Sequence, residues 1–326
     1  LLQPYDAPFP AGAWDRLDAR IGALRKAGVR PLLMFVASPA WARDSAGNFA
    51  CNVADYCLAP PADNRVDAWA EFVAAVAARY TTAAGLEIWN EPNQNSFWRT
   101  GVDPARYVRL VCAARAAVRR AGSTAPIVTG GLDGGTALQT QPSNTFLSAA
   151  YDAGLGNCAD GIGIHPYAGP LAPDATGNTF QGEIARIRGV MRAHGDAVHQ
   201  IWVTEAGWTT TGPFAVTARQ QADYLVAAYR FASKQPDIAA FVVHTLVDPF
   251  VPNLADPAYG VIAADGKPKL AYTALRDAAA RTQPLKPGKR RTKRRTTSKP
   301  ASTRRPRGLS GAKGAAEQPH LATIHA

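Results

Sequence analysis

The stretch Leu86-Glu87-Ile88-Trp89-Asn90-Glu91-Pro92-Asn93 reads as a short buried strand that ends in polar side chains. A second stretch of the same kind is Ile201-Trp202-Val203-Thr204-Glu205-Ala206-Gly207-Trp208. Each stretch puts a glutamate where a strand should give way to a loop, with a tryptophan nearby. We expect Glu91 and Glu205 to lie at the same end of a sheet, because the carboxyl ends of parallel strands share one edge.

Outward from these two stretches, apolar runs alternate with helical patterns between residues 15 and 280. The runs are 31–37, 86–89, 126–129, 161–164, 200–204 and 239–246. Helical spacing of apolar residues is clear in 15–27, 65–80 and 104–120. Asp103 can cap the helix that Pro104 begins, and Thr217 with Gln220 has the spacing of a capping box. Strands that alternate with helices predict a parallel sheet with helices outside it.

The predicted loops differ in length at the two ends of the strands. Links from helix to strand are short, at 27–30, 81–85, 122–125 and 154–160, whereas links from strand to helix are long, at 38–64, 166–178 and 248–267. This asymmetry is typical of a TIM (β/α)8 barrel, an α/β fold whose active site is built from loops after the strands. A doubly wound sheet would usually carry a Gly-rich phosphate fingerprint after its first strand, and none is present. Only six strands can be counted, so we expect this chain to lack barrel strands 1 and 2.

The positive charge is concentrated at the C-terminal end. The chain has 326 residues and a net charge of +11, but residues 285–326 hold 12 Lys or Arg and one acid, and residues 1–284 are formally neutral. We therefore expect a barrel domain over 1–284 and a disordered Lys/Arg-rich tail over 285–326. The tail either binds an anionic envelope or another polyanion, or is solvated without a specific ligand. A neutral body does not favour nucleic-acid binding by the folded part.

Cysteine spacing and apolar content indicate the compartment. Cys51 and Cys57 are close enough to staple a loop with a disulfide, which suggests an oxidising environment. Cys112 and Cys158 either pair with each other or are small buried side chains. No apolar run is long enough to span a membrane, and residues 1–6 do not read as a signal peptide. We expect a monomeric, secreted or cell-surface protein whose signal peptide lies upstream.

The two glutamates suit glycosidic bond cleavage, in which one carboxyl protonates the leaving oxygen and another attacks or activates water. Glu91 lies beside Trp89 and Pro92, and a partly apolar surround keeps a carboxyl protonated. Asn90 can hold a sugar hydroxyl. A single glutamate at a strand end is more often a solvated residue or an ion-pair partner, but two such residues beside tryptophans weaken that interpretation. We expect no metal and no cofactor.

Trp89-Asn90-Glu91-Pro92 with Thr204-Glu205 three strands later resembles clan A, the large clan of (β/α)8 retaining glycoside hydrolases. Glu-Ile-Trp-Asn-Glu-Pro-Asn followed by Phe97-Trp98 is most similar to family 39-like proteins, with family 5 cellulase-like proteins close behind. The resemblance implies that Glu91 ends strand 4 as acid/base and that Glu205 ends strand 7 as nucleophile. The strand count agrees if 31–37 is strand 3. The implied substrate is a β-linked polysaccharide or oligosaccharide.

The resemblance also implies sugar-binding residues. Asn90 would bind the 2-hydroxyl, and His165 and Tyr167 match the His-x-Tyr pattern of strand 6 that lines the cleft. Clan members often carry a Trp at the end of strand 8, which this chain lacks, so His244 or Asp248 would contact sugar instead. Three tryptophans fall in loops after the strands and either stack on sugars or pack in the core: Trp41, Trp98 and Trp208.

Two other functions fit parts of the sequence. A non-catalytic carbohydrate-binding or cell-surface protein on a degenerate barrel would explain the missing strands, although the intact Glu91 and Glu205 argue against it. Nucleic-acid binding through the tail would be salt-sensitive and would vanish on deletion of residues 285–326.

Overall fold

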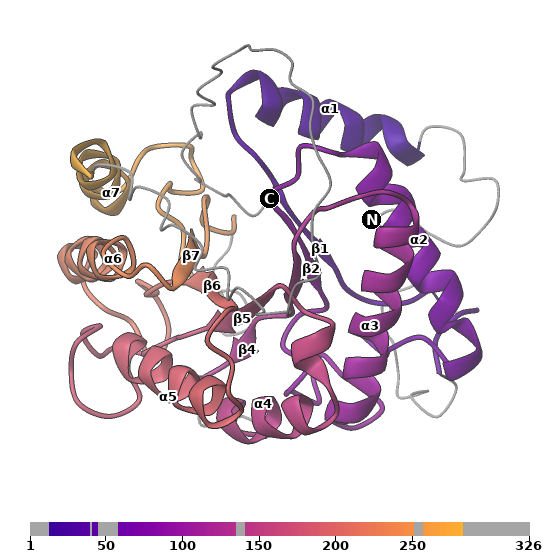
Figure 1. Ribbon diagram of the computed structural model, residues 1–326. Helices are drawn as coiled ribbons and strands as arrows, with labels where there is room; N and C mark the ends of the chain where they lie inside the picture. The colour runs from indigo at the N-terminus through magenta and orange to yellow at the C-terminus, as the bar shows by residue number, and fades with distance from the viewer. Residues whose placement is uncertain (1–12, 40, 45–57, 135–140, 251–256, 283–326) are drawn as a thin grey trace, which may run out of the picture.

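The computed structural model describes residues 13–39, 41–44, 58–134, 141–250 and 257–282 (Figure 1). In chain order its elements are α1 Ala13–Lys26, β1 Leu32–Phe35, the 3-10 helix η2 Asp63–Arg65, α2 Val66–Arg79, β2 Gly85–Ile88, α3 Pro104–Arg120, β3 Ile127–Thr129, β4 Leu132–Asp133, α4 Ser143–Asp152, the 3-10 helix η3 Leu155–Asn157, β5 Gly161–His165, α5 Phe180–Ala193, β6 Gln200–Ala206, α6 Ala218–Ala232, β7 Ile238–Val243 and α7 Leu270–Arg281.

The strands form one parallel sheet in the order β1-β2-β3-β5-β6-β7, and the short β4 also pairs with β5. The helices lie around the outside of this sheet (Figure 1). β3 and β4 together take one strand position, with Gly130 and Gly131 between them. The arrangement is a partial (β/α)8 barrel, which confirms the expected fold, and six strand positions lie within the described residues. In the numbering that the sequence resemblance implies, β2 is strand 4 and β6 strand 7.

Local sequence signals account for where several helices begin. The Asp103 side chain accepts a hydrogen bond from the Arg106 amide at 2.9 Å, and Pro104 takes the first turn of α3. Thr217 and Gln220 form the predicted capping box of α6, with bonds of 3.2 and 2.9 Å. Both predicted helix starts are confirmed.

Helix α3 is tied to the sheet by ionic and covalent links. Arg115 and Arg119 pair with Asp160 at 2.6 and 2.7 Å, just before β5. A disulfide joins Cys112 to Cys158, with Cα atoms 4.8 Å apart, which confirms pairing over the alternative of two free buried thiols. These links fix α3 against the amino ends of the strands, on the opposite side of the sheet edge from the loops that follow the strands.

Some expectations concern residues that the structure does not describe. The Cys51–Cys57 disulfide, the boundary after residue 284 and the disorder of the basic tail all lie outside the described residues. Within the described ranges, no helix combines the length and apolar character that a membrane crossing requires.

Candidate active site

Three side chains from three strand positions meet at the carboxyl ends of the strands. Glu91 follows β2, His165 ends β5 and Glu205 lies near the end of β6. His165 Nδ1 is 2.9 Å from Glu91 Oε1 and 3.7 Å from Glu205 Oε2. One carboxylate oxygen of each glutamate and one ring nitrogen of the histidine all lie within 4.8 Å of one another. The two glutamates singled out in the sequence are therefore neighbours.

The backbone after β2 is held in an unusual conformation. Trp89 has a φ of 74° and Glu91 a φ of 40°, in the left-handed region that residues other than glycine rarely adopt. The Glu91 amide donates to the Gly131 carbonyl at 3.1 Å, and the Glu91 carbonyl accepts from the Gln94 amide at 2.9 Å. Such conformations cost about 1–3 kcal/mol each and persist where surrounding contacts enforce them. They turn the Glu91 carboxyl toward His165.

Glu205 is surrounded by hydrogen-bond donors and aromatic rings. The Tyr167 hydroxyl donates to Glu205 Oε2 at 2.6 Å, and His244 Nδ1 lies 3.6 Å from the same oxygen. The rings of Tyr167, His244 and Tyr259 pack edge to face, with centroids 5.4 to 6.1 Å apart. A hydrogen bond to an ionised carboxylate stabilises its negative charge.

The acids around His165 favour its charged form. Its burial would lower the pKa, but the negative charges of Glu205, Glu91 and Glu87 outweigh burial and raise the pKa of His165 to about 9. Burial also raises the pKa of Glu91, an effect opposed by the hydrogen bond from His165. The site therefore holds an imidazolium between two carboxyls, one of which takes up a proton more readily than an exposed glutamate.

Among the described residues, the donor atoms of this cluster lie close enough together to hold a metal ion. A metal ligand must offer a neutral imidazole nitrogen. A metal ion bound by these atoms would therefore require the neutral form of His165, whereas the surrounding acids raise its pKa to about 9.

Two of the predicted sugar-binding residues remain to be placed beside this cluster. Asn90 is 7% exposed, and its Oδ1 is buried without a hydrogen-bond partner among the described residues. Asp248 interacts with other residues: it accepts a hydrogen bond from the Gly260 amide at 2.7 Å and pairs with Lys269 at 3.0 Å. The structure thus gathers His165, Tyr167 and His244 around Glu205 and gives Asp248 a local structural partner.

The three predicted tryptophans lie in different environments. Trp41 is 41% exposed in the loop after β1, with the Arg65 guanidinium 5.4 Å from its ring. Trp98 is completely buried, and its ring packs against Trp89 and Tyr107. Trp208 is 1% exposed and donates through Nε1 to the Leu171 carbonyl at 2.9 Å. Trp98 and Trp208 therefore present no exposed ring face in this structure, and Trp41 does.

Four site residues were not singled out from the sequence: Glu87, Gln94, Asp133 and Tyr259. Glu87 is buried inside β2, accepts a hydrogen bond from the Gly131 amide at 3.0 Å, and has its pKa raised to about 7 by burial. Gln94 donates to the buried carboxylate of Asp133 at 2.6 Å. A lone acid inside an apolar run, as in 85–88, was the signal that could have drawn attention to Glu87.

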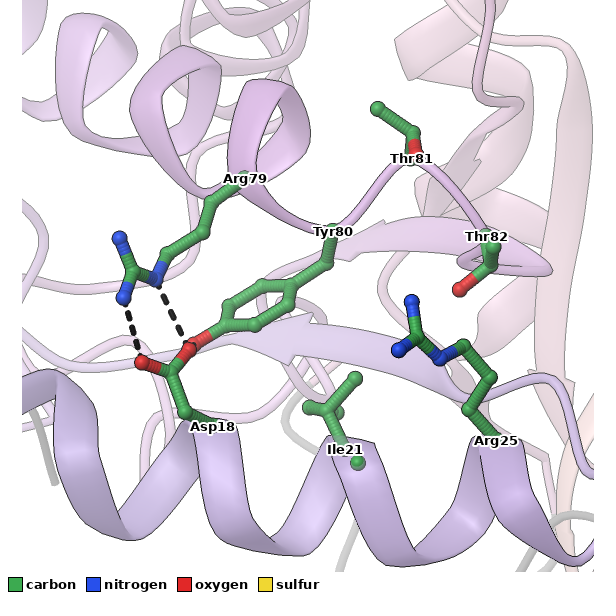
Figure 2. Close-up of a pocket in the computed structure, with 8 residues that line it drawn as sticks. Asp18, Ile21, Arg25, Arg79, Tyr80, Thr81 and Thr82 are labelled. Carbon is green, nitrogen blue, oxygen red and sulfur yellow. Dashed lines mark hydrogen bonds and ion pairs between the residues drawn. The ribbon is translucent and has the colours of Figure 1, made fainter.

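A separate cavity of about 350 Å³ lies between α1 and the end of α2 (Figure 2). Arg79 and Tyr80, which line it, both bond to Asp18, with Nε–Oδ1 and hydroxyl–Oδ1 distances of 2.8 Å. Thr81 and Thr82, which line the cavity, precede β2, so it lies at the amino ends of the strands. It is therefore not part of the carboxylate site.

No protein-family model matches the chain, and no curated protein matches it in sequence. Solved structures do match. A family 39 glycoside hydrolase from Bacteroides cellulosilyticus superposes with a TM-score of 0.67 at 21% identity, covering 86% of this chain and 56% of that one. A monomeric beta-xylosidase from Caulobacter crescentus gives 0.62 at 19% identity, with coverages of 83% and 57%, and a glucosidase from Croceicoccus marinus gives 0.61 at 18%, with coverages of 85% and 54%.

These comparisons establish the class of fold, a (β/α)8 barrel. Within that class the chain is similar to family 39 structures, as the motif around Glu91 suggests. The chain spans a little over half the length of the structures it matches.

Proposed function

We propose that the protein is a retaining glycoside hydrolase that cleaves β-glycosidic bonds of a polysaccharide or oligosaccharide by double displacement. The observation that carries the proposal is the approach of Glu91 and Glu205 to within 4.8 Å through one oxygen of each. Retaining enzymes have carboxyl groups about 5–5.5 Å apart, whereas inverting enzymes need roughly 6.5–9.5 Å to admit a water. The matched structures named as a beta-xylosidase and a glucosidase support the same class of substrate.

Glu91 is suited to the role of acid/base. Its raised pKa, caused first by burial, keeps a proton available for the leaving oxygen. As the glycosidic bond breaks, that proton moves to the departing oxygen and Glu91 becomes a carboxylate. In the second step the carboxylate takes a proton from water as the water attacks the sugar.

Glu205 is suited to the role of nucleophile. The hydrogen bond from Tyr167 holds Oε2, so the carboxylate has a fixed orientation toward the sugar carbon. Attack by Glu205 on the anomeric carbon would form a covalent glycosyl-enzyme and expel the leaving group that Glu91 protonates. Hydrolysis then releases the sugar with retained configuration and restores both side chains.

Sugar contacts are proposed for the polar groups beside the pair. The buried Oδ1 of Asn90 lacks a partner among the described residues, so a sugar hydroxyl that donates to it would satisfy a group that is costly to leave unpaired. His244 is 33% exposed with Nδ1 3.6 Å from Glu205 Oε2, and the exposed ring of Trp41 is a candidate stacking surface. His165, Trp98 and Trp208 are left out of this set because their rings are buried.

The proposal is tested with aryl β-glycosides that differ in leaving group, starting with xylosides and glucosides. Glu205→Gln should abolish turnover of all of them. Glu91→Ala should keep measurable turnover only of substrates with good leaving groups, and added azide should restore turnover with a β-glycosyl azide as product. Equal loss on every leaving group would refute the acid role. A 2-fluoro glycoside should label Glu205, as peptide mass spectrometry would show; a label elsewhere would refute the nucleophile.

A non-catalytic carbohydrate-binding protein is the competing outcome of the same test. Binding of an oligosaccharide with no turnover of any glycoside would favour it. We also propose a secreted or cell-surface location and a monomer. The Cys112–Cys158 disulfide supports an oxidising compartment. The proposed interaction of the basic tail with a polyanion would appear as salt-sensitive binding that deletion of residues 285–326 removes.

A further inference from the structure

Glu87 is a fully buried carboxylate that lies deeper in the barrel than the proposed catalytic pair. It is 1% exposed and precedes Glu91 by four residues on β2. The charged or titratable groups that act on it are His165 from β5 and Glu205 from β6, and Glu87 in turn acts on Tyr107 from α3. A buried charge is costly unless it is paired and hydrogen-bonded.

Glu87 is linked to Glu91 through one glycine. Its Oε1 accepts from the Gly131 amide at 3.0 Å, and the carbonyl of the same glycine accepts from the Glu91 amide at 3.1 Å. Gly131 has no room for a side chain, because an added Cβ would lie 2.0 Å from His165 Nε2. Glu87 therefore fixes Gly131, and the carbonyl of Gly131 in turn accepts the amide of Glu91 in its left-handed conformation.

Glu87 is linked to Glu205 through the preceding residue. Thr204, from β6, acts on the Glu87 carboxylate and lowers the pKa that burial raises. The Thr204 hydroxyl also lies close to Gly131, because a Cβ added to Gly131 would be 2.6 Å from Thr204 Oγ1. Glu87 thus lies next to residues that adjoin both proposed catalytic glutamates.

We propose that Glu87 is a positioning residue that, through Gly131 and Thr204, fixes the placement of Glu91 and Glu205. This inference rests on the proposed function for its link to turnover, but not for its link to His165. The negative charge of Glu87 is one of the causes that raise the pKa of His165, after those of Glu205 and Glu91.

The first test replaces Glu87 with Gln, which has the same shape and still accepts from the Gly131 amide. We expect kcat on an aryl glycoside to fall roughly 10- to 100-fold with KM changed less than about threefold, since small misplacement of reacting groups costs rate rather than binding. Glu183→Gln is the matched control: Glu183 is also a buried carboxylate, bonded to Ser143, and its pKa is raised by burial. It should leave kcat within about twofold of the wild-type value.

The second test needs no substrate. An NMR titration of the His165 ring, assigned with a His165→Gln variant, should show its pKa lowered by roughly one pH unit in Glu87→Gln, because one of three carboxylates loses its charge. Glu183→Gln should leave that pKa unchanged. If the wild-type protein turns over no glycoside, the proposed function fails while this titration still decides the role of Glu87.

A third variant covers the case in which Glu87→Gln does not fold. Thr204→Val removes the hydroxyl that stabilises the Glu87 carboxylate, so His165 should again titrate at lower pH and kcat should fall. An unchanged pKa of His165 in the folded variant, or an unchanged kcat in an active enzyme, would overturn the proposal.

Discussion

Replacing Tyr167 with Phe removes one hydroxyl and leaves the ring in place. That hydroxyl donates to Glu205 Oε2 at 2.6 Å. A hydrogen bond to a charged group contributes about 1.5–3 kcal/mol. Since roughly 1.4 kcal/mol corresponds to a factor of ten in rate, kcat/KM should fall about 10- to 150-fold if the bond holds the nucleophile in its reactive orientation.

The control for this change is Tyr151→Phe. The Tyr151 hydroxyl donates to Asp196 at 2.5 Å, from α4 and remote from the carboxylate pair. Both variants lose a tyrosine–carboxylate hydrogen bond, so both should lose stability in thermal unfolding. Only Tyr167→Phe should lose kcat/KM on an aryl glycoside. Activity within about threefold of wild type for a folded Tyr167→Phe protein would refute the reasoning.

Three further predictions follow from other contacts. The pKa of His165, about 9 in the folded protein, lies above its unfolded value of about 6.5, so its stabilisation of up to about 3 kcal/mol is complete below pH 6.5 and is lost as pH rises through 9. Urea midpoints should therefore drop across that window in the wild type and change less in His165→Gln; parallel curves would contradict the charge assignment. Opening the Cys112–Cys158 disulfide with Cys112→Ser should cost about 4 kcal/mol from the chain entropy of a 46-residue loop, and a reductant should lower the unfolding midpoint of the wild type more than that of Cys112→Ser. Trp98→Ala should cost about 3–5 kcal/mol because the ring is fully buried, and a small loss would show that the cavity collapses.

The fold was largely readable because its signals are local and repeated. Six apolar runs became the six strand positions of the sheet, with bounds shifted by at most a few residues. The caps at Asp103 and Thr217 were correct because capping depends on residues three apart in sequence. The short β4 was not foreseen, because two residues after a double glycine carry no periodicity.

The site was readable where strand ends defined it. Glu91, His165 and Glu205 meet because parallel strands bring their carboxyl ends to one edge. The loop tryptophans were less predictable. Trp98 is buried because its ring packs against Trp89 and Tyr107, and no periodic pattern in the sequence predicts contacts between a loop residue and residues of other elements. Glu87 was missed because the sequence does not show which residues of other strands contact an acid inside a strand.

The left-handed backbone at Glu91 sets two demands against each other. A side chain at that φ costs free energy that asparagine or glycine would largely avoid. The carboxyl of Glu91 lies 2.9 Å from His165, and a buried imidazolium that loses its carboxylate partner is costly. Glutamate therefore suits this turn through its side chain and not through its backbone.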